Sequence, residues 1–452
     1  MNRRPALTLV SSVAGASVVA LDGTVLTVAQ PALQRDLGAS FEQVQWTSTA
    51  YLVAVAGLLV LGGRLGDRHG HRPLFAAGML GFGAASAGIA LAPGIGWVIA
   101  LRALQGVCGA LLQPATLGML RTAFPPERLG RPIAVRTAAI ALSAAAGPVA
   151  GGALVTALGW RAVFLLGVGP ALLFGLLALA LPRDRRPRPA PAVPLGLPGA
   201  LLLAVVLGCA VDILVTLPGP GWTAPVVAAV AGTALVGHER RTAVPMLPPG
   251  LLGSPAVASA LLLLVAASAA LSGTLFVTTY VLQDTIGLAP LDSALRALPL
   301  PALMILAASL SPVLSRRLGE RRTVPAAAAV LATGALVLAR ETGAFAVCAG
   351  FALLGAGFGT VMVAATQVVV REAAASAAGV AGGLQQTAMN VGPALGVAVA
   401  VTLRGSAGDG VPPSAVLGAV ALLAGAAAGR ALPGRRPVTG PGRRERAPAS
   451  AR

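Results

Sequence analysis

The stretch Gly63-Arg64-Leu65-Gly66-Asp67-Arg68-His69-Gly70-His71-Arg72 comes directly after a long apolar run. A degraded copy, Arg317-Leu318-Gly319-Glu320-Arg321-Arg322, follows another apolar run 253 residues later. A charged turn that recurs between hydrophobic segments indicates a membrane protein built by duplication. Internal repeats of this kind are typical of secondary transporters, whose two halves move about a site near the middle of the bilayer. Transport is therefore the leading hypothesis.

The composition excludes a water-soluble body. Hydrophobic residues make up 56% of the 452 residues and charged residues only 11%, which reverses the balance of a soluble enzyme. Apolar runs of about 17 to 25 residues, long enough to cross the bilayer as helices, recur along the chain. The fourteen predicted spans are 6–29, 46–63, 74–92, 96–119, 133–157, 161–181, 195–216, 222–237, 255–281, 293–315, 324–340, 344–368, 378–402 and 413–431. Residues 222–237 give the weakest of these signals.

The basic residues predict the orientation in the membrane. The formal net charge is +18, and all 33 basic residues are arginines. With the N-terminus placed inside, most of these arginines fall in the predicted inside segments, which is the positive-inside pattern. The tryptophans then lie at predicted outer helix ends, where indole rings favour the membrane interface. Both termini are therefore expected to be cytoplasmic.

A second repeat supports the duplication. Gly147-Pro148-Val149-Ala150-Gly151 in the fifth span is echoed by Gly392-Pro393-Ala394-Leu395-Gly396 in the thirteenth. Spans 1 to 6 and 9 to 14 are then parallel repeats, and spans 7 and 8 are an inserted pair. The expected all-α organisation is a six-helix half at 1–181, a cytoplasmic linker at 182–194, the inserted pair and its following loop at 195–253, a second six-helix half at 254–432, and a disordered basic tail at 433–452.

Charged residues inside the predicted spans are functional candidates, because a charge at the bilayer centre costs about 2.5 to 3.5 kcal/mol on insertion scales. Asp22 lies in the first span, and a carboxyl there could carry a proton. The alternative is a structural carboxyl bonded to Thr24 or to neighbouring backbone. Asp212 lies near the outer end of the seventh span, where we expect it to reach the interface.

The fourth span carries a polar stripe. Arg102, Gln105, Gly109 and Gln113 share one helix face, and such a stripe in a membrane helix is expected to face a cavity. Gln105 and Gln113 are therefore cavity-lining candidates. Arg102 keeps its charge at any relevant pH, so we expect it to pair with an acid or to alter the proton affinity of that acid. A structural pairing with a loop carboxylate is the alternative.

The second half offers a matching stripe in the thirteenth span, where Gly382, Gln386 and Asn390 recur every four residues. Gln386 and Asn390 are cavity-lining candidates, although polar residues of this kind also bind helices together.

Glycine and proline interrupt the fifth span at Gly147-Pro148 and Gly151-Gly152. The proline removes one backbone hydrogen bond, and the glycines let another helix approach closely. A bend at this place could seal one face of a transporter.

The motifs together resemble the major facilitator superfamily, and within it the fourteen-helix drug/proton antiporter branch, over nearly the whole chain. Leu21-Asp22-Gly23-Thr24-Val25 resembles the acidic signature of that branch, and the stretch from Gly63 to Arg72 resembles the gating loop of the superfamily. Leu101-Arg102-Ala103-Leu104-Gln105-Gly106 resembles the motif whose arginine is implicated in proton transfer. Ser143 to Gly152 is similar to the fifth-helix motif of antiporters, which is largely absent from uptake symporters.

This resemblance implies a role for each motif. The expected proton-coupling residues are Asp22 and Arg102. The expected gating loop, in which an aspartate and arginines form a cytoplasmic charge contact, comprises Gly63, Asp67, Arg68, Gly70 and Arg72. The expected hinge comprises Gly147, Pro148, Gly151 and Gly152. Ser143 departs from the usual glycine of the fifth-helix motif, and His71 replaces a usual arginine or lysine, which could make closure of the gate depend on pH.

The expected function is proton-coupled export of small hydrophobic or amphipathic compounds, such as drugs or antibiotics, by alternating access in the cell membrane. Uptake symport or facilitated diffusion of a small metabolite is the alternative, and a membrane sensor that does not transport is a further one. An enzyme is not expected, because no span pairs a nucleophile with a base. We expect no cofactor and no metal site. The expected partners are a small-molecule substrate, protons and lipid, without nucleic acid, and the protein is expected to act as a monomer.

Overall fold

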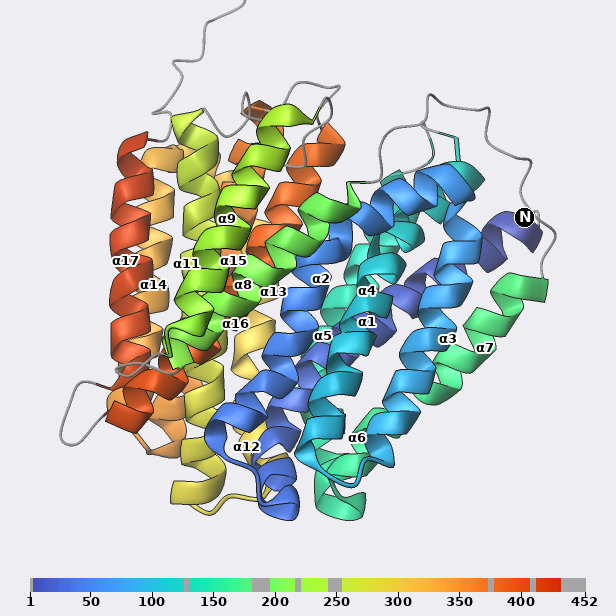
Figure 1. The fold of residues 1–452 in the computed structure, drawn as a ribbon. Coiled ribbons are helices and arrows are strands. Elements are labelled where there is room, and N and C mark those ends of the chain that lie inside the picture. The colour runs from blue at the N-terminus through green and yellow to red at the C-terminus, as the bar shows by residue number, and fades with distance from the viewer. Residues whose placement is uncertain are drawn as a thin grey trace, which may run out of the picture.

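The computed structural model is a bundle of long helices (Figure 1). It describes residues 3–125, 128, 130–180, 196–215, 221–242, 254–372, 378–406 and 412–431. The predicted linker at 182–194 and the predicted tail at 433–452 lie outside these residues. The described part of the chain contains helices and no strand, so the all-α prediction is confirmed.

The first half of the bundle is formed by α1 (Arg3–Leu37), α2 (Phe41–His69), α3 (His71–Ala90), α4 (Ile95–Ala123), α5 (Gly130–Leu158), α6 (Trp160–Leu165) and α7 (Val168–Ala180). The inserted pair is α8 (Leu197–Val215) and α9 (Thr223–Arg241). The second half is formed by α11 (Pro255–Tyr280), the π-helix η2 (Val281–Thr285), α12 (Pro290–Arg296), α13 (Pro299–Leu318), α14 (Glu320–Arg340), α15 (Ala344–Glu372), α16 (Ala378–Ser406) and α17 (Pro413–Ala431).

Thirteen helical segments of the described chain are long and apolar enough to cross a membrane. The segment with the weakest sequence signal forms α9, which is not among the thirteen and whose last turn carries His238, Arg240 and Arg241. Two predicted spans are broken: the sixth divides into α6 and α7, and the tenth into α12 and α13. Pro299 begins α13, a position whose N–H would have no partner within the helix, so a proline costs no hydrogen bond there.

The two halves repeat one packing scheme. In the first half α2 packs on α4, α1 on α5, and α3 on both α4 and α7. In the second half α13 packs on α15, α11 on α16, and α14 on both α15 and α17. The same neighbours in the same order are what the duplication in the sequence predicts.

The charged stretch quoted first is helical rather than a loop. α2 continues to His69 and α3 begins at His71, so Gly70 alone makes the turn with φ 94°. Gly319 makes the matching turn between α13 and α14 with φ 83°. A positive φ is strained for any residue with a Cβ atom, and glycine avoids that strain. The predicted loop is thus corrected to a pair of helix ends joined by one glycine.

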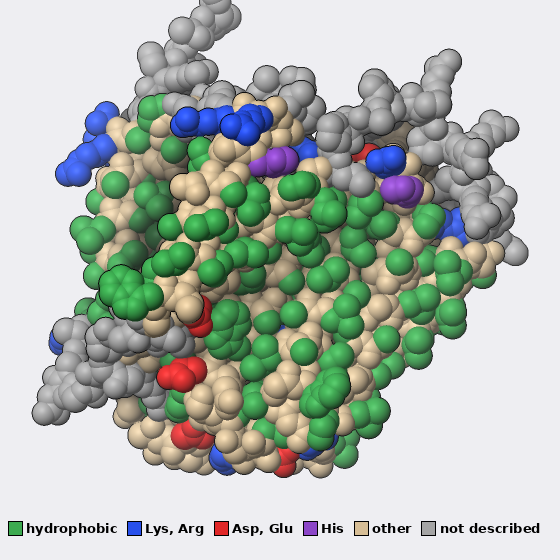
Figure 2. Space-filling view, viewed as in Figure 1, with side chains coloured by type: hydrophobic (Ala, Val, Ile, Leu, Met, Phe, Trp, Pro, Cys, Tyr) green, Lys and Arg blue, Asp and Glu red, His purple; other side chains and the backbone are tan. Residues whose placement is uncertain are grey.

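The inserted pair lies over the seam between the halves, where α2 packs on α16 (Figure 1). α8 contacts α2, where Gly57 lets it approach so closely that a Cβ atom at Gly57 would be 2.6 Å from the Cβ of Ala204. It also contacts α16, where Thr402 Oγ1 donates a hydrogen bond to the carbonyl of Leu214. Hydrophobic side chains cover the middle of this face, whereas arginines and histidines gather at its upper end (Figure 2). This distribution fits an apolar belt facing lipid.

Candidate functional site

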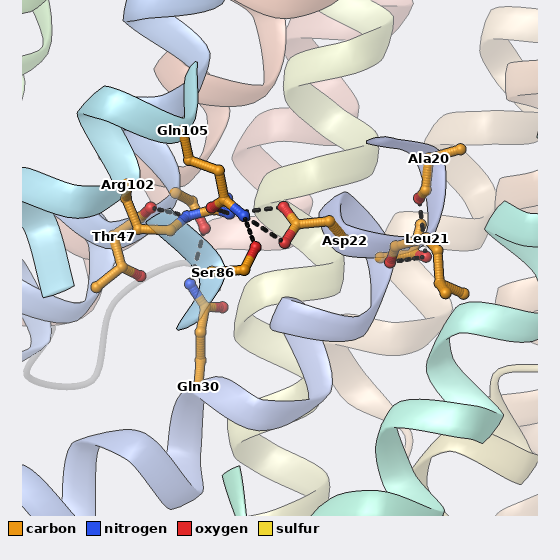
Figure 3. Close-up of polar contacts among 10 residues, drawn as sticks. Ala20, Leu21, Asp22, Gln30, Thr47, Ser86, Arg102 and Gln105 are labelled. Carbon is orange, nitrogen blue, oxygen red and sulfur yellow. Dashed lines mark hydrogen bonds and ion pairs between the residues drawn. The ribbon is translucent and has the colours of Figure 1, made fainter. Parts of the chain in front are cut away.

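The central feature of the first half is an ion pair between Asp22 on α1 and Arg102 on α4 (Figure 3). Arg102 Nη1 lies 2.6 Å from Asp22 Oδ2, and only 2% of the arginine side chain and 11% of the aspartate side chain are exposed. The two residues are 80 positions apart in the chain. The packing of α1 on α4 therefore brings together the two residues that the sequence predicts for proton coupling.

Gln105, one helical turn after Arg102, connects both members of the pair. Its Oε1 accepts a hydrogen bond from Arg102 Nη1 at 2.6 Å, and its Nε2 donates to Asp22 Oδ1 at 3.2 Å. The same Nε2 donates to Ser86 Oγ on α3 at 2.7 Å. Gln105 is fully buried, so the structure places it in this polar network, and a role in lining a cavity stays a prediction.

The second helix completes the surroundings of Arg102. Arg102 Nε donates to the carbonyl of Thr47 at 2.9 Å, and its Cζ lies 4.5 Å from the centre of the Tyr51 ring. An aromatic face attracts a guanidinium in this position. Sequence reasoning missed Thr47, Tyr51 and Ser86, because a backbone carbonyl and a small hydroxyl carry no signal until the helices are packed.

The alternative interpretation of Asp22 fails in its stated form. Thr24 Oγ1 donates to the carbonyls of Ala20 and Leu21, while the contacts of the Asp22 carboxylate in the described chain are those with Arg102 and Gln105. Asp22, Arg102 and Gln105 therefore form one polar network, in which the Thr47 carbonyl and Gln105 also hold Arg102.

The other polar candidates lie apart from this network. Gln113 and Gln386 are partly exposed, on α4 and α16. Asn390 is 8% exposed, and its Nδ2 has no hydrogen-bond partner among the described residues. It borders a tight gap between α2, α8 and α16 that is otherwise apolar, among residues such as Leu52 and Val211.

The predicted gating residues surround the Gly70 turn. Gly63 lies within α2, and Arg68 is exposed at the end of that helix. Asp67 Oδ1 lies 3.3 Å from His71 Nε2, and 77% of the aspartate side chain is exposed. Arg72 Nε donates to the carbonyl of Ala178 on α7 at 2.9 Å. The described partner of Asp67 is therefore the histidine that departs from the motif.

His71 is enclosed by two glycines. A Cβ atom at Gly66 on α2 or at Gly118 on α4 would overlap the imidazole ring. Only small residues on both neighbouring helices leave room for the ring, which is 17% exposed. The turn at Gly70, where the gate is predicted, is thus packed around an imidazole.

The glycines of the predicted hinge hold α5 against two helices. A Cβ atom at Gly147 would overlap the Thr24 side chain of α1, and one at Gly151 would lie 3.2 Å from the Cα of Val25. A Cβ atom at Gly152 would lie 2.8 Å from both the Leu291 Cα and the Pro290 carbonyl oxygen of the other half. In α16, Gly392 makes the equivalent close approach to α11. These contacts show where α5 is held; a bend that moves is a prediction.

The two halves also meet at the predicted outer end. Gln283 in η2 donates through Nε2 to the carbonyl of Val28 on α1 at 3.2 Å. Phe41 of α2 contacts the rings of Phe276 and Tyr280, with ring centres 6.3 and 4.4 Å apart. Sequence reasoning missed this contact, because nothing in the sequence pairs the start of the second span with the end of the ninth.

With the site described, comparison with known proteins decides the family. The model of the Major Facilitator Superfamily matches residues 13–397. The chain belongs to this superfamily.

Several relatives within the Major Facilitator Superfamily are named as exporters. The chain is 38% identical over 423 residues to the tetracenomycin C resistance and export protein of Streptomyces glaucescens, covering 90% of this chain and 78% of the relative. It is 31% identical over 398 residues to the multidrug efflux pump LfrA of Mycolicibacterium smegmatis, covering 85% and 78%.

A solved structure extends the likeness to the fold. A bacterial homologue of the human lysosomal transporter Spinster, crystallised in an inward-facing and unoccupied conformation, superimposes with a TM-score of 0.70 at 15% identity. The likeness covers 95% of this chain and 97% of that protein. The major facilitator fold expected from the motifs is therefore confirmed.

Proposed function

We propose that this superfamily member exports small hydrophobic or amphipathic compounds, of the drug or antibiotic kind, in exchange for protons. The direction is supported by relatives named for export of tetracenomycin C and for multidrug efflux. The observation that carries the coupling is the Asp22–Arg102 pair, in which a buried guanidinium meets a carboxylate whose side chain is only 11% exposed, between helices that belong to one half. A structural role alone would be served as well by apolar residues of similar volume.

Asp22 is the proposed proton carrier and Arg102 its modulator. When Asp22 takes up a proton, Arg102 keeps its bonds to the Thr47 carbonyl and to Gln105, so the cation stays in place while its counter-charge is removed. Loss of the proton restores the ion pair. Alternation between these two states changes the contacts that hold α1 to α4, which offers a means to link proton movement to helix movement.

The gates follow from the remaining motifs. Asp67, Arg68 and Arg72 act at the inner gate, with Gly63 and Gly70 shaping the helix ends, and Gly147, Pro148, Gly151 and Gly152 form the hinge. Gln105, Gln113, Gln386 and Asn390 line the substrate path in part of the cycle. The two six-helix halves at 1–181 and 254–432 move as units about the inserted segment at 195–253.

The setting of this activity is the cell membrane, with both termini in the cytoplasm and a single chain as the working unit. The protein acts on its substrate by transport rather than by catalysis, as is typical of its superfamily, and the driving force is the proton gradient.

Inside-out vesicles that contain the protein test the proposal. An acid-inside pH gradient is imposed, amphipathic antibiotics and dyes are added in turn, and the lumenal pH is followed. We expect loss of the gradient that depends on the added compound in the wild type and in Asp284→Asn, a control carboxylate that is exposed. We expect no such loss in Asp22→Asn, although that variant inserts normally. Active transport by Asp22→Asn at the wild-type rate would refute the role of Asp22.

A further inference from the structure

Arg136 is a cation inside the first half for which the described chain provides no balancing acid. It lies in the second turn of α5, about 10 Å along the helix from its predicted inner end, and its side chain is half-buried. Its Nε and Nη2 both donate to Thr116 Oγ1 on α4, at 3.1 and 2.9 Å. No carboxylate is among its hydrogen-bond or ion-pair partners in the described residues. Arg136 falls within the predicted span 133–157, and sequence reasoning missed it as a charge inside a span.

The contrast with Arg102 shows what Arg136 lacks. Arg102 has a carboxylate at 2.6 Å and an aromatic face beside it, whereas the partner of Arg136 is a neutral hydroxyl. A guanidinium carries five N–H donors and cannot lose its charge, and two of its five donors are used here. Ionisable residues inside membrane proteins are otherwise paired or face a functional path.

The neighbours of Arg136 hold it in one position. Thr116 Oγ1 donates to the carbonyl of Gln113 at 2.8 Å, so its lone pairs face the guanidinium. The Thr116 carbonyl accepts a hydrogen bond from Ser12 Oγ on α1 at 2.7 Å. Three helices thus fix one cation among neutral oxygens, with the partly exposed Gln113 one turn away. The remaining N–H donors are preorganised for an acceptor that the described residues do not supply.

We propose that Arg136 is an anion-binding subsite of the transport path, and that the exported compounds include amphipathic acids whose carboxylate binds there. This inference rests on the proposed export function and names a substrate class for it. Thr116 lies 14 residues after Arg102 on α4, about 21 Å along the helix. The anion and the proton therefore bind at separate places on one helix, and the charge of Asp22, already balanced by Arg102, does not repel the anion at close range.

The test uses fluorescent aromatic carboxylates and their primary amides, which match in rings and differ in charge. Binding to the purified protein and uptake into inside-out vesicles are both measured for each acid–amide pair. The matched control is Arg131→Gln, which removes an exposed arginine from the same helix. The conservative variant is Arg136→Lys, which keeps the charge.

We expect the wild type and Arg131→Gln to bind and take up the acids in preference to the amides. Arg136→Gln should weaken binding of the acids by about 10- to 100-fold, the loss expected for a hydrogen bond to a charged group, while binding of the amides stays within about twofold. Arg136→Lys should retain part of the preference, because a lysine is a single-point donor rather than a fork.

Two results would overturn the inference. One is equal binding of acids and amides by the wild type across the panel. The other is an equal loss of both in Arg136→Gln, which would make Arg136 a structural residue. Failure of the proposed export function is distinguishable in the wild type. It removes the gradient-driven uptake of the amides as well as of the acids, whereas failure of this inference alone leaves uptake of the amides by the wild type intact.

Discussion

The buried pair between Asp22 and Arg102 leads to an asymmetric prediction about stability. Asp22→Leu leaves an arginine whose side chain is 2% exposed without its counter-charge, and an arginine cannot escape that state by losing a proton. Arg102→Met leaves a carboxyl that can become neutral by binding a proton and that keeps its bond to Gln105. The two single variants therefore break the same ion pair but lower the unfolding free energy by different amounts.

The contacts set the magnitudes. Asp22→Leu removes a charge-assisted bond of 2.6 Å from a buried cation, and such a loss costs about 3 to 5 kcal/mol of unfolding free energy. Arg102→Met removes the hydrogen bonds to the Thr47 carbonyl and to Gln105, and leaving these acceptors unsatisfied lowers the unfolding free energy by about 1 to 3 kcal/mol. The double variant leaves no buried charge, so it should be more stable than Asp22→Leu, and within about 2 kcal/mol of the wild type.

Thermal unfolding of the purified protein, followed by the fluorescence of its four tryptophans, measures this order. The expected ranking of the melting temperatures has the wild type highest and Asp22→Leu lowest, with Arg102→Met and the double variant between them. A double variant as unstable as the sum of the single variants would show that the two residues are not coupled. An Arg102→Met protein that melts below Asp22→Leu would show that the buried cation is not the costly partner.

Three further perturbations test other parts of the structure. Gly152→Leu should reduce transport at least tenfold in vesicles, because even a Cβ atom there would lie 2.8 Å from the Cα of Leu291 in the other half. A leucine would therefore push the two halves apart at the predicted outer end, and such overpacking destabilises the closed contact by about 1 to 3 kcal/mol. Transport at the wild-type rate would show that this contact opens freely. Thr402→Val removes the hydrogen bond to the Leu214 carbonyl at nearly constant side-chain volume. Because this bond holds α16 against α8, crosslinking of the two helices through introduced cysteines should become slower. An unchanged crosslinking rate would show that packing alone holds the contact. His71→Gln should flatten the dependence of transport on pH below about 6.5, because burial lowers the pKa of the imidazole from that ordinary value and protonation strengthens its contact with Asp67. Coincident wild-type and variant profiles would remove His71 from the proposed gate.

Much of the architecture could be predicted because its causes are local. A run of apolar residues long enough for the bilayer identifies itself without neighbours, and the duplicated Gly70 and Gly319 turns are visible because both need a glycine at positive φ. The same locality explains the errors at helix ends: continuation of α2 to His69 depends on hydrogen bonds within the helix, which hydropathy does not report.

The candidate site likewise contains residues that the sequence identifies and residues that only the packing of the helices identifies. The sequence marked Asp22 and Arg102, because a charge in an apolar span is costly and therefore conspicuous. It could not supply Ser86, Thr47 or Tyr51, whose types are ordinary and whose contacts exist only after α2 and α3 pack against α4.

By itself, then, the sequence determined that the chain is a duplicated bundle of membrane helices with an aspartate and an arginine inside the spans of its first half. Only the tertiary structure decided that these two groups bond to each other and that His71 lies beside Asp67 between two glycines. It also decided that no acid of the described chain lies beside Arg136. The physical reason is distance along the chain. Hydrophobicity and helix period act within one segment, whereas the partner of a charge is chosen by which helices pack together, and here those partners lie 80 residues apart.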